Sequence, residues 1–72
     1  MAMKESNYEK DKVFMELINE LRRIERTKDP KEMLYDFGRL YNEAMNQLVA
    51  FHQIDGEDAM DIIDELVFGN RG

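Results

Sequence analysis

The chain has 72 residues with ten Lys/Arg, sixteen Asp/Glu and no cysteine, and its formal net charge is −6. At this length it forms one domain at most, and the lack of cysteine excludes disulfides and thiolate metal sites, which suits a reducing cytoplasm. The negative charge disfavours direct contact with DNA or RNA, since nucleic-acid binding depends on basic side chains. No apolar run approaches the roughly 20 residues that cross a bilayer. We therefore expect a cytoplasmic protein that contacts neither membrane nor nucleic acid.

The first predicted helix covers residues 6–27. Ser6 and Glu9 have the spacing of a capping box, in which each side chain bonds a backbone N–H of the other's turn. Residues 1–5 are expected to be a disordered N-terminus, and we interpret Met1 and Ala2 as additions ahead of a native start. Apolar residues then recur every three or four positions, as expected for one buried helix face: Phe14, Leu17, Ile18, Leu21 and Ile24.

The second predicted helix covers residues 30–52 and has the strongest start signal in the chain. Asp29 is the expected cap, Pro30 is tolerated at the first helical position, and Glu32 completes a capping box. The apolar stripe that follows is wider than one neighbouring helix requires. Gly38 costs about 1 kcal/mol relative to alanine at mid-helix. It either admits a closely packed helix or only weakens the segment, and we favour close approach.

The third predicted helix is shorter and covers residues 56–68. Asp55 is its expected N-cap, and Gly69 is a natural left-handed terminator. Residues 70–72 beyond it are expected to fray. The three helices together form a single domain over residues 6–69.

The predicted fold class is all-α, a three-helix domain with two long antiparallel helices and a short third one. The short joints require consecutive helices to be antiparallel neighbours. A third helix of about 13 residues spans roughly 20 Å, against roughly 33 Å for the second. Apolar surface is therefore left uncovered, and we expect the chain to assemble as a dimeric helical bundle.

Charge is distributed unevenly along the chain. Residues 1–39 contain nine Lys/Arg and nine Asp/Glu, whereas residues 40–72 contain one Arg and seven acids. A basic protein surface is the natural complement of such a C-terminal half.

Most of these acids fall on one face of the third helix, within an arc of about 120°. Like charges four residues apart each cost a few tenths of a kcal/mol, and no lysine relieves them. The face is either a solvated surface that keeps the chain soluble or a docking site for a basic partner. Phe68 lies on the same side, where it either folds back on the core or serves as an apolar anchor. The candidate partner-binding residues are Asp58, Asp61, Asp64, Glu65 and Phe68.

Basic residues surround the first joint, and interleaved acids dilute their field. We interpret them mainly as complements of the helix dipole and partners in intrahelical pairs. The alternative is that the acidic helix of a second copy docks on them. The cluster consists of Arg22, Arg23, Arg26, Lys28 and Lys31.

No motif in the sequence carries catalysis, and we expect no catalytic residue, cofactor or metal site. His52 is the only histidine, and a general base needs a nucleophile or an orienting carboxylate nearby. The acids around Gly56 follow helical spacing, whereas an EF-hand has alternating oxygen ligands with glycine at its sixth position.

The sequence thus favours a non-enzymatic protein–protein interaction module, an adaptor, inhibitor or small regulatory protein that acts as a homodimer. It would bind a basic partner surface through its acidic C-terminal helix. The alternative is a DNA-mimicking inhibitor of a nucleic-acid-binding protein, of a kind that would suit a phage or mobile element. Carboxylates one helical turn apart stand about 6 Å from each other, similar to the phosphate spacing along a strand.

Overall fold

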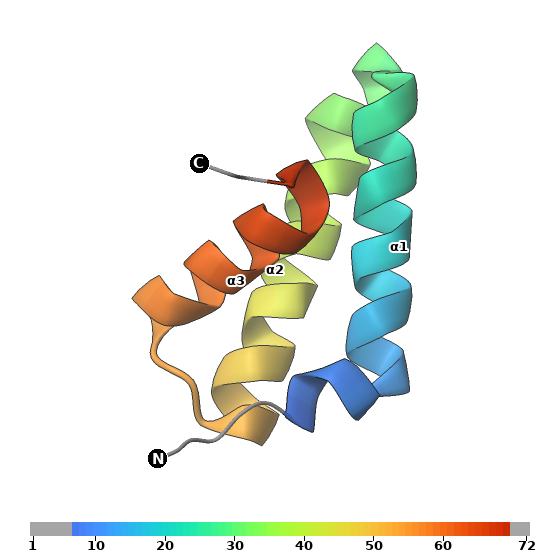
Figure 1. Ribbon diagram of the computed structural model, residues 1–72. Coiled ribbons are helices and arrows are strands. Elements are labelled where there is room, and N and C mark those ends of the chain that lie inside the picture. The colour runs from blue at the N-terminus through green and yellow to red at the C-terminus, as the bar shows by residue number, and fades with distance from the viewer. Residues whose placement is uncertain (1–6, 70–72) are drawn as a thin grey trace.

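The computed structural model describes residues 7–69, and within these residues the chain is all-helical and forms three helices, as predicted (Figure 1). A 3₁₀ turn, η1 (Asn7–Lys10), precedes α1 (Lys12–Thr27). The second helix consists of η2 (Glu32–Asp36), α2 (Phe37–Asn46) and η3 (Gln47–Phe51), and the third is α3 (Gly56–Phe68). The expectations for residues 1–5 and 70–72 lie outside the described residues.

The first helix does not begin where the capping-box spacing predicted. Its α-helical part starts at Lys12, six residues after Ser6, which lies outside the described residues. Asp11 is the N-cap, with extended backbone and a carboxylate that accepts a hydrogen bond from the Phe14 N–H. An aspartate at this position satisfies one of the free N–H groups of the first turn. Sequence spacing alone had not predicted this aspartate as a cap.

The second helix is continuous from Pro30 to His52, but both of its ends are π-helical. Asp29 caps it as predicted, since its Oδ1 accepts bonds from the backbone N–H groups of Lys31 and Glu32. The Glu32 carboxylate does not complete a capping box and instead reaches across to α1. A π turn is wider than an α turn and is usually confined to short insertions in α-helices. Here the two π segments flank α2, and each includes exposed apolar side chains.

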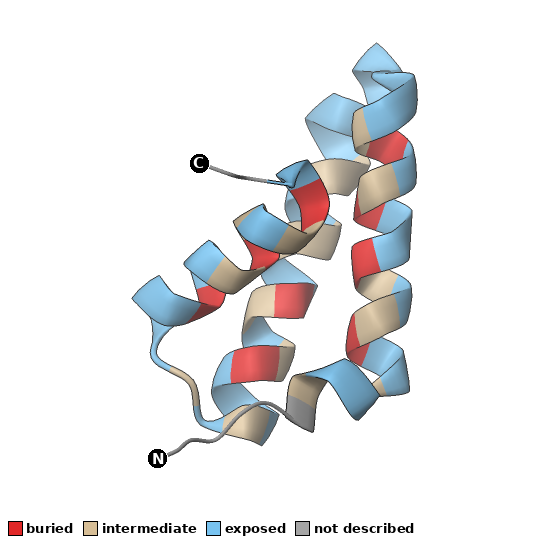
Figure 2. Cartoon of the chain, viewed as in Figure 1, coloured by how far each residue is buried: buried red, intermediate tan, exposed pale blue. Residues whose placement is uncertain are grey.

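The first two helices form an antiparallel hairpin, and α3 crosses it obliquely (Figure 1). All three helices contribute to one core, and no described polar or charged residue is buried in it. Burial follows the inner faces of the helices and fades toward the tip of the hairpin (Figure 2). The buried cluster comprises Phe14, Ile18, Leu21, Ala44, Leu48, Ala59, Ile63 and Val67.

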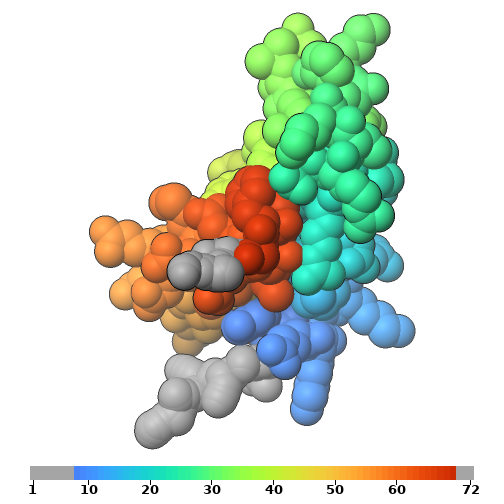
Figure 3. Space-filling model, turned by 45° about the horizontal axis from the view of Figure 1, so that its top comes forward, coloured from blue at the N-terminus to red at the C-terminus, as the bar shows by residue number. Residues whose placement is uncertain are grey.

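The hairpin tip projects past α3, and the space-filling view shows it standing clear of the third helix (Figure 3). Leu34 and Tyr35, in η2, are 71% and 69% exposed, and Phe51 in η3 is 72% exposed. Large apolar side chains therefore remain at the surface of a single chain, as the difference in helix lengths predicted. The dimer that was inferred from this surplus stays a prediction.

Gly38, in α2, is not a point of close approach within the chain. A Cβ atom at this position would meet no atom within 4 Å. Within one chain the glycine therefore admits no neighbouring helix, and the close approach expected there stays a prediction for a helix from outside.

A left-handed residue follows the second helix and offers a simple test of its geometry. Gln53 has φ 55°, a conformation that costs most side chains about 1 kcal/mol. We expect Gln53→Gly to raise the free energy of unfolding by about 0.5–1 kcal/mol. Urea titration followed by circular dichroism measures the change. Gly69→Ala, at φ 65°, is the matched reverse substitution and should lower stability by a similar amount.

Candidate acidic interface

The acidic residues of α3 lie on the face opposite the core, as their spacing predicted. Ala59, Ile63 and Val67 are the buried residues of α3. Asp58, Asp61 and Glu65 are exposed, and Asp64 is half-buried. Asp55 occupies the N-cap position, although its side chain accepts no hydrogen bond there. The position of the acids is set by the buried face, because packing three apolar residues fixes the rotation of the helix.

None of these carboxylates is neutralised. No ion pair in the described part of the chain includes a residue of α3. Asp64 and Glu65 also lie near the C-terminal end of the helix, where the dipole disfavours negative charge. One cation opposes the negative end of the helix dipole, since Arg22 Nε donates a 2.7 Å hydrogen bond to the Leu66 carbonyl oxygen. Arg22 thus satisfies a free carbonyl of the last turn and ties α1 to α3.

Asp64 has a structural contact that separates it from the other acids. The Tyr41 hydroxyl donates a 2.7 Å hydrogen bond to Asp64 Oδ1 and lies 3.4 Å from the Met60 carbonyl oxygen. Burial and, second, this bond to a negative carboxylate raise the pKa of Tyr41, so it remains a donor at every physiological pH. Asp64 is therefore held against the second helix rather than offered freely to solvent.

The Phe68 side chain packs against the second helix but stays partly exposed to solvent. Its ring packs on Phe37 with centroids 6.0 Å apart, and Phe37 in turn lies 6.2 Å from Tyr41. The Phe68 side chain nevertheless remains 48% exposed. The ring therefore folds back against Phe37, and its role as an apolar anchor for a partner stays a prediction.

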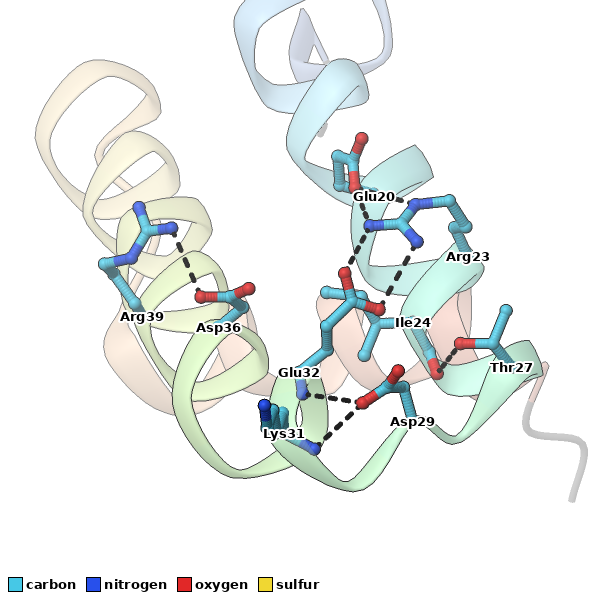
Figure 4. Close-up of polar contacts among 9 residues, drawn as sticks. All are labelled: Glu20, Arg23, Ile24, Thr27, Asp29, Lys31, Glu32, Asp36 and Arg39. Atoms are coloured by element: carbon cyan, nitrogen blue, oxygen red, sulfur yellow. Dashed lines mark hydrogen bonds and ion pairs between the residues drawn. The ribbon is translucent and has the colours of Figure 1, made fainter.

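Several basic residues at the first joint bond other groups of the chain, as Figure 4 shows for Arg23. Arg23 bonds Glu20 on its own helix and Glu32 across the joint, and these bonds raise the pKa of the guanidinium further. Lys28 pairs with Glu25 at 2.9 Å. The interpretation as local charge pairing therefore describes Arg23 and Lys28. Such exposed pairs typically contribute less than about 1 kcal/mol each.

A polar cluster that the sequence did not reveal lies at the opposite end of the hairpin. His52 Nε2 lies 2.8 Å from Asp11 Oδ2, and Gln47 Nε2 donates to the same oxygen at 3.0 Å. These bonds lower the pKa of Asp11 to about 2, and the bond from Gln47 has the larger effect. The orienting carboxylate thought missing beside His52 is thus present, 41 residues away in sequence. The one available signal was topological, since an antiparallel hairpin brings the start of its first helix beside the end of its second.

The contacts that define this cluster include no hydroxyl or thiol nucleophile. The cluster connects the start of the first helix to the end of the second. Among the described residues, no group of three His, Asp or Glu side chains is arranged to hold a metal ion. In the same part of the chain, no helix combines the length and apolarity needed to span a membrane. Comparison with family models, curated proteins and solved structures yields no match.

Proposed function

We propose that this chain is a non-enzymatic protein–protein interaction module that binds a basic partner surface through α3. The observation that carries the proposal is the unneutralised row formed by Asp58, Asp61 and Glu65 on the exposed face of a well-anchored helix. Charge that has no partner within the chain is available to one outside it, and complementary charge speeds and orients association. Phe68, half exposed at the end of the row, supplies apolar area beside the charges.

The proposal includes a homodimer, because large apolar side chains stay exposed at the hairpin tip and on the second helix. Exposed apolar patches mark interfaces in many small soluble proteins. A two-fold dimer is the commonest assembly that covers it.

Charge reversal on the acidic face provides the test. The purified chain is immobilised and exposed to extract of its source cells, and retained proteins are quantified by mass spectrometry. We expect a basic protein to be retained at about 0.1 M salt and released at about 0.5 M, where the Debye length falls below about 5 Å. Asp61→Lys with Glu65→Lys should reduce its retention at least about tenfold.

The matched control is Glu9→Lys with Glu16→Lys, which changes net charge equally on exposed residues outside α3. This control should retain the basic protein like the wild type. Equal loss in both double variants would mean that only overall charge matters and would refute a specific surface. Retention by all variants would exclude the acidic face.

The DNA-mimic alternative makes a different prediction for the same complex. A mimic of the phosphate backbone occupies the partner's DNA site, so added duplex DNA displaces the partner from the immobilised chain. Docking at any other basic surface leaves a ternary complex with DNA bound. The row of exposed carboxylates on α3 is the observation that favours this alternative.

A further inference from the structure

The second helix carries an exposed stripe on the side away from the core. We define the outer stripe as six exposed residues that follow one another along this helix, from Lys31 through η2 and α2 to Val49 in η3. They are Lys31, Leu34, Tyr35, Gly38, Asn42 and Val49.

The composition of the outer stripe is unusual for this protein. Charged residues make up 36% of the chain, yet the stripe contains a single one, Lys31. Leu34, Tyr35 and Val49 are exposed by 71%, 69% and 43%. Large apolar side chains exposed along one helix are typical of a surface that packs against another helix.

Gly38 lies within the stripe, and its lack of a side chain leaves a shallow depression in the helix surface there. Glycine at mid-helix lowers helix stability by about 1 kcal/mol relative to alanine, and no atom of this chain occupies the space that it opens. A glycine on a helix surface allows a second backbone to approach closely. The feature is thus unused in the single chain but suited to a helix from outside.

We propose that the outer stripe docks the same stripe of a second copy, with the two helices antiparallel about a two-fold axis near Asn42. This inference rests on the dimer included in the proposed function and names its interface. In this arrangement Tyr35 lies opposite Val49 of the second copy, and Gly38 lies opposite Asn46. A large apolar side chain thus meets a smaller one, and the glycine meets Asn46, an exposed residue beside the stripe. Asn42 meets its own copy, and its amide can both donate and accept there.

Charge complementarity selects a second copy as the occupant. The antiparallel arrangement places Lys31 of each chain beside the C-terminal end of the other chain's second helix, which is the negative end of its dipole. Asp55 lies three residues beyond His52, where that helix ends. Elsewhere two chains of net charge −6 repel each other, whereas this face has no acidic residue to oppose its own copy.

Sedimentation equilibrium of the full chain between about 1 and 500 µM tests the proposal. We expect the wild type to reach twice the mass of one chain. Leu34→Glu and Tyr35→Glu should each weaken dimerisation at least about tenfold. Val13→Glu, on an apolar side chain of α1 that is 56% exposed, adds the same charge outside the stripe and should dimerise like the wild type. Circular dichroism verifies that each variant keeps its helix content.

Two further variants test the orientation and the glycine. Lys31→Glu should weaken the dimer and Asp55→Lys added to it should restore it. Lys31 lies at the start of the second helix and Asp55 lies beyond its end, roughly 33 Å away, so the rescue cannot occur within a chain. Gly38→Ala should raise the unfolding temperature of the dilute chain but weaken dimerisation, because its Cβ meets open space in one chain and a helix in the pair.

A one-chain mass at every concentration would overturn the proposal, as would a dimer that survives both glutamate variants. Either result leaves the binding of a basic partner through α3 untouched, because that is measured separately with the Asp61→Lys, Glu65→Lys variant. This variant in turn should still dimerise.

Discussion

Replacing Ile63 by alanine is expected to lower the free energy of unfolding by about 3 kcal/mol. Its side chain is fully buried at the centre of the inner face of α3. Removing three carbons from such a site forfeits their transfer free energy and leaves a cavity, which costs about 2–5 kcal/mol in compact cores. A chain of this size has a total stability of only several kcal/mol. The variant should therefore be largely unfolded or carry a detached α3, and it should lose the acidic face with it.

Urea unfolding followed by circular dichroism at 222 nm measures the effect. Met60→Ala is the matched control, since the Met60 side chain is 44% exposed on the same helix and should cost less than about 1 kcal/mol. A similar small loss in both variants would show that α3 is not anchored by its buried face. Packing would then not set the rotation of α3 about its axis, and the acidic row would have no defined orientation.

Replacing Asp11 by alanine is expected to cost about 2–3 kcal/mol, the second largest effect. The substitution removes the N-cap bond to Phe14 and the two bonds that Gln47 and His52 make to Oδ2. Loss of an N-cap typically costs about 1 kcal/mol, and a bond to a charged group contributes about 1.5–3 kcal/mol. Asp11→Asn retains an N-cap oxygen without the charge, so it should cost less, about 1 kcal/mol.

The same carboxylate gives stability a defined dependence on pH. Its pKa is about 2 in the folded chain against 3.8 ordinarily, so the ionised form stabilises the fold. This contribution, about 2 kcal/mol, is present above pH 4–5 and is lost as pH falls toward 2. Thermal unfolding at pH 6, 4 and 3 should show a decline in the wild type that is smaller in Asp11→Asn. Equal declines in both proteins would contradict the assigned role of Asp11.

The sequence by itself determined the helices and the faces that they bury. Asp29 and Pro30 start the second helix, Gly69 ends the third, and the apolar spacing in α1 identifies its core residues. These features are predictable because capping and amphipathic periodicity depend on residues within one or two turns. The acidic face of α3 follows from the same periodicity, since it is the face opposite Ile63.

The tertiary structure decided everything that depends on which helix ends meet. It brought Gln47 and His52 to Asp11, the N-cap of α1, because these residues meet only in the folded hairpin. It also gave Asp64 a partner in Tyr41. These contacts depend on the tertiary structure because they join residues 23 to 41 positions apart in the sequence. The distance between such residues is set by packing. Local spacing contains no information on such pairs, whereas it predicts the apolar periodicity and the helix ends at Asp29 and Gly69.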